Sequence, residues 1–104
     1  MPNRGFDGKY VPTEKAQVPI TTHAIHYGTS IFEGIRAYWN GKNLNVFRLD
    51  EHVKRFRRSG QFDNISLNFS DEEITNAVIG ICKKNKIKKI MLHKTILFCR
   101  RLRN

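Results

Sequence analysis

Acidic residues are absent from the C-terminal segment of this 104-residue sequence. Residues 83–104 carry nine Lys or Arg and no Asp or Glu, whereas residues 1–82 carry ten Lys or Arg and nine Asp or Glu. The formal net charge of +10 therefore comes almost entirely from the last segment. Nucleic-acid-binding proteins usually carry their charge on a folded face or a recognisable arm. The distribution predicts a nearly neutral domain with a basic tail and no specific nucleic-acid partner.

Long apolar runs and cysteines are also scarce. No stretch approaches the roughly 18 apolar residues of a membrane span, and the first ten residues lack a signal-peptide pattern. We therefore expect no membrane contact and a cytoplasmic location. The two cysteines, Cys82 and Cys99, do not form a Cys-x-x-Cys pair or lie at metal-ligand spacing from a histidine. No metal site is predicted, and Cys82 is expected to be a buried structural thiol.

Two hairpins are predicted from turn residues between apolar stretches. Asp7-Gly8 is a short hairpin signal, and Asn40-Gly41 is a stronger one because both residues tolerate a positive φ. Alternation over residues 31–38 places two sets of side chains on opposite faces of the first strand of the second hairpin. One set is Ile31, Glu33, Ile35 and Ala37, and the other is Phe32, Gly34, Arg36 and Tyr38. Residues 44–47 are the returning strand, and residues 18–20 favour a further extended stretch.

Two helices are predicted after the hairpins. Asp50 can cap a helix over about residues 51–59, which Gly60 would end. Ser70 and Glu73 form a capping box that opens a second helix, and Asn85 is a plausible end. Strands followed by helices indicate an α+β fold in which antiparallel hairpins pack against two helices.

A known family is recognisable in residues 23–38, which read His-Ala-Ile-His-Tyr-Gly-Thr-Ser-Ile-Phe-Glu-Gly-Ile-Arg-Ala-Tyr. This block closely resembles the opening motif of branched-chain amino acid aminotransferases, which are fold-type IV enzymes that use pyridoxal 5′-phosphate. The resemblance continues through Val46-Phe47-Arg48-Leu49-Asp50-Glu51-His52 and Arg55, and covers roughly residues 5–89. It implies that residues 1–89 are an incomplete small N-terminal domain of this fold.

The resemblance implies roles for five residues. Arg55 matches the arginine that binds the cofactor phosphate, for which a guanidinium offers a fork of donors. Phe32 and Gly34 match the wall of the substrate side-chain pocket, and Arg36 belongs to the same motif with a supporting role. Tyr27 matches a tyrosine that reaches the active site of the partner subunit in a homo-oligomer. No catalytic residue is assigned, because the Schiff-base lysine of the family lies well beyond residue 104.

Without the resemblance, each of these residues has a simpler interpretation. Arg55 is then a solvated helix cation beside Lys54, Arg57 and Arg58. Phe32 becomes a core aromatic residue, Gly34 a strand-bulge glycine, and Tyr27 a half-buried surface aromatic residue. The four histidines, His23, His26, His52 and His93, match no metal or triad pattern. His23, His26 and His52 are expected to be structural parts of the family motif.

Residues 90–104 depart from the family pattern. The family usually continues with Tyr-Ile-Arg-Pro, whereas this chain continues with Met91-Leu92-His93-Lys94-Thr95. These five residues can be written with codons that read Cys-Tyr-Ile-Arg-Pro in another frame. Our hypothesis is a frameshift near residue 90 that produces an aberrant basic tail, and the coding DNA across this segment tests it.

The expected function is therefore the N-terminal part of a branched-chain amino acid aminotransferase, inactive alone. Such an enzyme exchanges an amino group between leucine, isoleucine or valine and 2-oxoglutarate, with pyridoxal 5′-phosphate as carrier. The alternative is a small basic protein that binds nucleic acid or an acidic surface through its tail.

Overall fold

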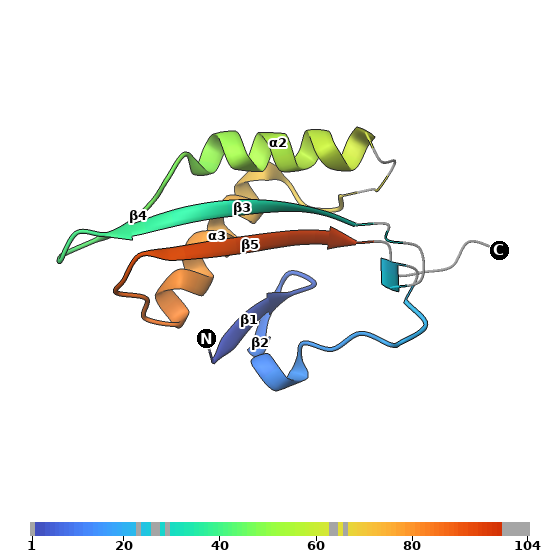
Figure 1. Ribbon diagram of the computed structural model, residues 1–104, viewed down its shortest axis with the longest axis horizontal. Helices are drawn as coiled ribbons and strands as arrows, with labels where there is room; N and C mark the ends of the chain where they lie inside the picture. Colours follow the sequence, from blue (N-terminus) through green and yellow to red (C-terminus); the bar gives the residue numbers. More distant parts are fainter. Residues whose placement is uncertain are drawn as a thin grey trace.

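The computed structural model describes residues 2–22, 24–25, 28, 30–62, 65 and 67–98. Its sheets are an antiparallel pair, β1-β2, and a three-stranded antiparallel sheet in the order β4-β3-β5. The α2 helix runs along the β3 side of the larger sheet, α3 lies behind it, and the β1–β2 hairpin lies on the β5 side (Figure 1). This is the α+β fold expected from the sequence. The elements are β1 (Asn3–Phe6), β2 (Lys9–Pro12), η1 (Thr13–Lys15), β3 (Ser30–Trp39), β4 (Leu44–Val46), α2 (Leu49–Phe62), α3 (Asp71–Lys84) and β5 (Met91–Phe98).

Both predicted hairpins are confirmed. Asp7 and Gly8 have φ values of 55° and 81°, as a two-residue turn of the primed type requires. A Cβ at Gly8 would lie 2.8 Å from Phe69, so packing as well as backbone geometry favours glycine there. In the second hairpin the Asn40 side chain accepts hydrogen bonds from the backbone N–H groups of Lys42 and Asn43 at 2.9 and 2.7 Å. These local bonds explain why the turns could be recognised in the sequence.

The alternation of β3 is also confirmed, and it positions the core. Ile31, Ile35 and Ala37 are buried, and Glu33 lies between them on the same face with 4% of its surface exposed. The apolar face of α2 packs against this face through Val53. The core cluster consists of Ile31, Ile35, Leu49, Val53, Phe56, Ile74 and Val78.

The α2 helix is longer than the sequence predicted. It begins at Leu49, and Asp50 lies in its first turn instead of capping it. The expected end at Gly60 is wrong, because the helix continues to Phe62 and Gly60 is buried within it. Glycine costs a helix interior about 1 kcal/mol relative to alanine, and this cost is offset here by burial of the helix face that carries Gly60.

The predicted capping box at the start of α3 is confirmed. The Ser70 Oγ accepts from the Glu73 backbone N–H at 3.1 Å, and the Ser70 N–H donates to the Glu73 carboxylate at 3.1 Å. Asn85 is the C-cap, and its side chain donates to the Asn3 carbonyl at 3.0 Å while accepting from the Asn3 N–H at 2.8 Å. This pair of bonds ties the end of α3 to β1. Cys82 is buried on the apolar face of α3, as expected, and burial raises the pKa of its thiol.

The predicted extended stretch at residues 18–20 is wrong. Residues 16–19 have no regular structure, and a turn follows in which the Thr22 N–H and hydroxyl both donate to the Pro19 carbonyl, at 3.0 and 2.6 Å. Neither Val18 nor Ile20 belongs to a strand among the described elements, despite their β-propensity, and Ile20 is 80% exposed.

Residues 90–98 are the described part of the predicted tail, and residues 91–98 form β5. This strand pairs with β3 from Ser30↔Phe98 to Ala37↔Met91 and is part of the three-stranded sheet (Figure 1). Cys99 and the rest of residues 99–104 lie outside the described residues. The domain boundary at residue 89 and the frameshift stay predictions. No helix in the described ranges is long and apolar enough to cross a membrane.

We expect Ser70→Ala to lower the free energy of unfolding by about 1 kcal/mol, because the first turn of α3 loses its side-chain acceptor. Ser70→Asp should retain most of the wild-type stability, since a carboxylate also caps a helix. Urea denaturation followed by circular dichroism measures both variants. Equal stability of the alanine and wild-type proteins would contradict the role of the capping box.

Candidate functional site

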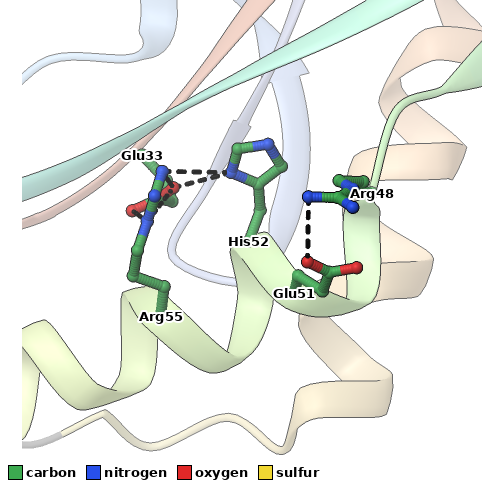
Figure 2. A network of polar contacts seen from close by, with 5 residues as sticks. All are labelled: Glu33, Arg48, Glu51, His52 and Arg55. Atoms are coloured by element: carbon green, nitrogen blue, oxygen red, sulfur yellow. Dashed lines mark hydrogen bonds and ion pairs between the residues drawn. The ribbon is translucent and has the colours of Figure 1, made fainter.

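Glu33 is the buried acidic residue at the centre of the candidate site. It lies on the helix-facing side of β3, and only 5% of its side chain is exposed. An isolated carboxylate in such a place is very unfavourable, so it requires donors. His52 and Arg55, which lie three residues apart on one face of α2, supply them (Figure 2).

Arg55 and His52 both contact the carboxylate of Glu33. The Arg55 Nε donates to both Glu33 oxygens, at 2.9 and 3.0 Å, and the Arg55 Nη2 donates to Oε1. The His52 Nδ1 lies 2.7 Å from the same Oε1, within hydrogen-bond distance. The guanidinium therefore binds Glu33 through one edge, and His52 completes the contact from the preceding turn of α2 (Figure 2).

These contacts set the protonation state of Glu33. Burial opposes ionisation and by itself would raise the pKa of Glu33, but the hydrogen bonds and charges of Arg55 and His52 outweigh it and lower that pKa below its ordinary value. The same carboxylate raises the pKa of Arg55. At neutral pH the cluster therefore contains a carboxylate and a guanidinium.

The remaining part of Arg55 faces solvent. Its side chain is 61% exposed, and among the described residues no hydrogen bond involves Nη1. A guanidinium held at one edge keeps further N–H donors for an anion at the other. A phosphate group therefore fits Arg55, although a single donor edge satisfies only part of it.

A second ion pair, at the N-terminal end of α2, differs from this cluster. Arg48 and Glu51 lie 3.5 Å apart at the start of the helix, with 63% and 65% of their side chains exposed (Figure 2). Solvent screens such a pair, so it contributes little to stability. The Glu33 carboxylate is buried, whereas both members of the Arg48–Glu51 pair are exposed, so the Glu33 cluster differs from an ordinary surface ion pair.

Three other predicted site residues, Phe32, Gly34 and Arg36, lie on the opposite face of β3. Phe32 is 61% exposed and lies under the Lys94 ammonium, whose Nζ is 4.5 Å from the ring centroid. Arg36 is exposed on the same face, and Gly34 is partly buried there. A Cβ at Gly34 would meet only Leu92, at an ordinary 3.5 Å. Among the described residues, therefore, no contact excludes an alanine at position 34.

The predicted site residues consequently form two groups separated by the thickness of one strand. One group, on the open face of the sheet, consists of Phe32, Gly34 and Arg36. Arg55 lies on the helix side, where Glu33 binds it. Tyr27, like His23 and His26, lies outside the described residues. Glu33 was missed as a site residue, although an acid in an apolar alternation is a signal of a buried ion pair.

Comparison with known families identifies the fold. The model of amino-transferase class IV matches residues 30–99. This range holds β3 with Glu33, α2 with Arg55, and α3. The chain belongs to the class IV amino-transferase family.

Branched-chain aminotransferases are among the similar class IV proteins. The probable branched-chain-amino-acid aminotransferase of Aquifex aeolicus is 37% identical over 100 residues, which cover 94% of this chain and 32% of that protein. The crystal structure of the branched-chain aminotransferase of Thermoproteus uzoniensis with norvaline has a TM-score of 0.88 and 36% identity, and the match covers 91% of this chain and 32% of that one.

A third similar protein, from Escherichia coli, agrees with these two. The crystal structure of its branched-chain amino acid aminotransferase has a TM-score of 0.86 and 34% identity, and the match covers 90% of this chain and 31% of that one. The chain thus spans about a third of the length of these class IV relatives and matches their N-terminal part. The alternative of a small basic binding protein is not supported.

We expect Glu33→Gln to lower the free energy of unfolding at pH 7 by about 1–2 kcal/mol, because two charge-assisted contacts are weakened while Arg55 remains largely solvated. The pH dependence should change as well. The folded-state pKa of Glu33 lies below its ordinary value of 4.5, so the stability it provides is present above pH 4.5 and is lost as the pH falls through the lowered pKa.

Urea denaturation between pH 7 and pH 3 tests this expectation. The Glu33→Gln protein should show a shallower loss of stability below pH 4.5 than the wild type. Glu51→Gln is the matched control because its carboxylate also pairs with an arginine but is exposed, and it should change the stability at pH 7 by less than about 0.5 kcal/mol. Equal effects of the two substitutions would contradict a special role for the buried carboxylate.

Proposed function

We propose that this chain provides the N-terminal part of a branched-chain amino acid aminotransferase. The observation that supports it most directly is Arg55, fixed by Glu33 and His52 with one exposed guanidinium edge, at the position where the resemblance implies the phosphate-binding arginine. The relatives named as branched-chain aminotransferases support the same reaction class. The substrates would be leucine, isoleucine or valine and 2-oxoglutarate.

The cofactor would be pyridoxal 5′-phosphate. When bound, its ring acts as an electron sink for the amino acid carbons. The contribution of this chain would be to hold and orient the phosphate through Arg55, whose direction Glu33 and His52 fix. Since a phosphate dianion needs several donors, the remaining ones must come from the rest of the enzyme. Cofactor affinity of this chain alone should therefore be low.

The open face of β3 would contribute to the substrate pocket. Phe32 offers an apolar ring for a branched aliphatic side chain, and Gly34 leaves room for it because glycine has no side chain. Arg36 would support this wall, and Tyr27 would reach the active site of a partner subunit in a homo-oligomer. A cytoplasmic location fits such an enzyme. Proton transfer requires the Schiff-base lysine, which the resemblance places beyond residue 104, so no catalytic residue is assigned here.

Arg55→Ala should remove the preference of this chain for a phosphorylated cofactor analogue. Deoxypyridoxine 5′-phosphate is a suitable probe because it lacks the aldehyde that reacts with lysines. We expect weak binding by the wild type, about tenfold weaker binding by Arg55→Ala, and unchanged binding by Arg58→Ala, a matched exposed arginine on α2.

Titration followed by NMR, with unphosphorylated deoxypyridoxine as the reference ligand, measures this preference. A similar loss of binding in both arginine variants would indicate general charge attraction and would count against the phosphate site.

The pure 104-residue chain should not transaminate leucine with 2-oxoglutarate in the presence of pyridoxal 5′-phosphate. The physical reason is the absence of a lysine positioned to form the Schiff base and move the proton. Formation of glutamate, measured against a blank without protein, checks the expectation. Turnover above this blank that persists after removal of trace enzymes by a second purification would disprove it.

A further inference from the structure

The turn between β3 and β4 contains an asparagine followed by a glycine, and the site described above makes no use of it. Asn40, Gly41, Lys42 and Asn43 are all exposed. They lie outside the paired residues of the hairpin, whose last pair is Trp39↔Leu44. Exposed turn tips are the segments in which solvent reaches the backbone and chemical change is best tolerated. The atoms of this turn are therefore accessible to water.

The side-chain amide of Asn40 is the electrophile of this turn. Its Oδ1 accepts hydrogen bonds from the backbone N–H groups of Lys42 and Asn43, at 2.9 and 2.7 Å. A nucleophile that adds to the Cγ of an amide moves negative charge onto the amide oxygen, so these two donors lie where the charge develops. The bonds that stabilise the turn therefore also lower the barrier to addition at Asn40.

The backbone nitrogen of Gly41 is the neighbouring nucleophile. Within the part of the chain that the structure describes, no hydrogen bond uses the Gly41 N–H, so its proton is accessible to water or hydroxide. Gly41 has a φ of 90°, and no heavy atom lies within 4 Å of the position that a Cβ would occupy. The absence of a side chain leaves the approach of this nitrogen to the Asn40 Cγ unhindered.

Asn85 shows the opposite arrangement and provides an internal reference. The next backbone nitrogen, that of Lys86, donates to the Lys83 carbonyl at 3.1 Å. The Asn85 Nδ2 donates to the carbonyls of Asn3 and Ile81, each at 3.0 Å. The fold thus holds both the nucleophile and the leaving nitrogen of Asn85, and we expect this residue to be unreactive.

We propose that Asn40 is a site of spontaneous deamidation, which the β3–β4 turn promotes. Base removes the amide proton of Gly41, the Gly41 nitrogen forms a bond to the Asn40 Cγ, and the Asn40 Nδ2 takes up a proton and leaves as ammonia. Water then opens the imide ring. Cleavage of the bond between the Gly41 nitrogen and Cγ gives aspartate, and cleavage of the bond to the Asn40 backbone carbonyl carbon gives isoaspartate. The net reaction consumes water, releases ammonia, and changes no oxidation state.

The two products should affect the hairpin differently. Aspartate keeps an oxygen acceptor for the N–H groups of Lys42 and Asn43, and its charge strengthens these bonds. Isoaspartate inserts a methylene group into the main chain of the turn and disturbs the pairing register that the turn sets. This proposal does not depend on the aminotransferase assignment, because it rests on the β3–β4 turn alone.

Incubation of the full 104-residue chain at pH 8, followed by peptide mapping with mass spectrometry, tests the proposal. We expect Asn40 to react at least tenfold faster than Asn85 and to yield both aspartate and isoaspartate. The rate should rise with pH, because the Gly41 nitrogen must lose its proton. A peptide of residues 36–47, which lacks the fixed turn, is the reference for the two donors. The folded chain should react at least as fast as this peptide.

Two variants of the turn separate the parts of the reaction. Gly41→Ala should slow deamidation of Asn40 at least tenfold, because a side chain hinders the attacking nitrogen. Lys42→Ala is the matched control, since it retains both backbone donors, and it should leave the rate within about twofold of the wild type. Equal rates at Asn40 and Asn85, a slower reaction in the folded chain than in the peptide, aspartate as the sole product, or an unchanged rate in Gly41→Ala would each overturn the proposal.

Hydrogen exchange measures the effect of the products on the hairpin. Asn40→Asp should leave exchange of the β4 amides unchanged, whereas the isoaspartate form, separated by chromatography, should exchange them at least tenfold faster. Unchanged exchange in the isoaspartate form would overturn the expected effect on β4.

Discussion

The burial of one carboxylate constrains how α2 packs on the sheet. Glu33 lies between Ile31 and Ile35 on the covered face of β3, where an unpaired charge would be very unfavourable. His52 and Arg55 supply its donors from one face of α2. Because these two residues must face β3, the helix rotation is fixed, and its apolar residues are directed into the core cluster beside them.

The same constraint gives Arg55 its direction. An exposed arginine on a helix normally samples many rotamers, but one edge of this guanidinium is held by Glu33. Preorganisation of this kind reduces the entropy lost when an anion binds. Phe32 and Gly34 flank Glu33 in the strand and face the other way. A cofactor phosphate and a substrate side chain would therefore contact two sides of one strand, and a complete pocket needs chain beyond the described residues to join them.

Local signals in the sequence predicted the local structure well. The turns at Asp7-Gly8 and Asn40-Gly41 and the capping box at Ser70 depend on residues within three positions of one another, so they are readable without the fold. The extent of α2 depends on burial of its face against the sheet, which outweighs the helix-breaking tendency of Gly60. The partners of Glu33 are 19 and 22 residues away, a distance over which the sequence pattern alone does not specify pairing.

The pairing of β5 with β3 depends on the main chain and little on which side chains of β5 face the interior. Ile96 and Thr95 favour an extended backbone, and β3 provides a continuous edge for main-chain bonds. Those two conditions place residues 91–98 in the sheet although His93 and Thr95 face the interior and Leu92 and Ile96 are exposed. The class IV family model matches residues 30–99, a range that includes β5, so the frameshift hypothesis rests on the charge distribution and the codon reading and not on the place of this strand in the sheet.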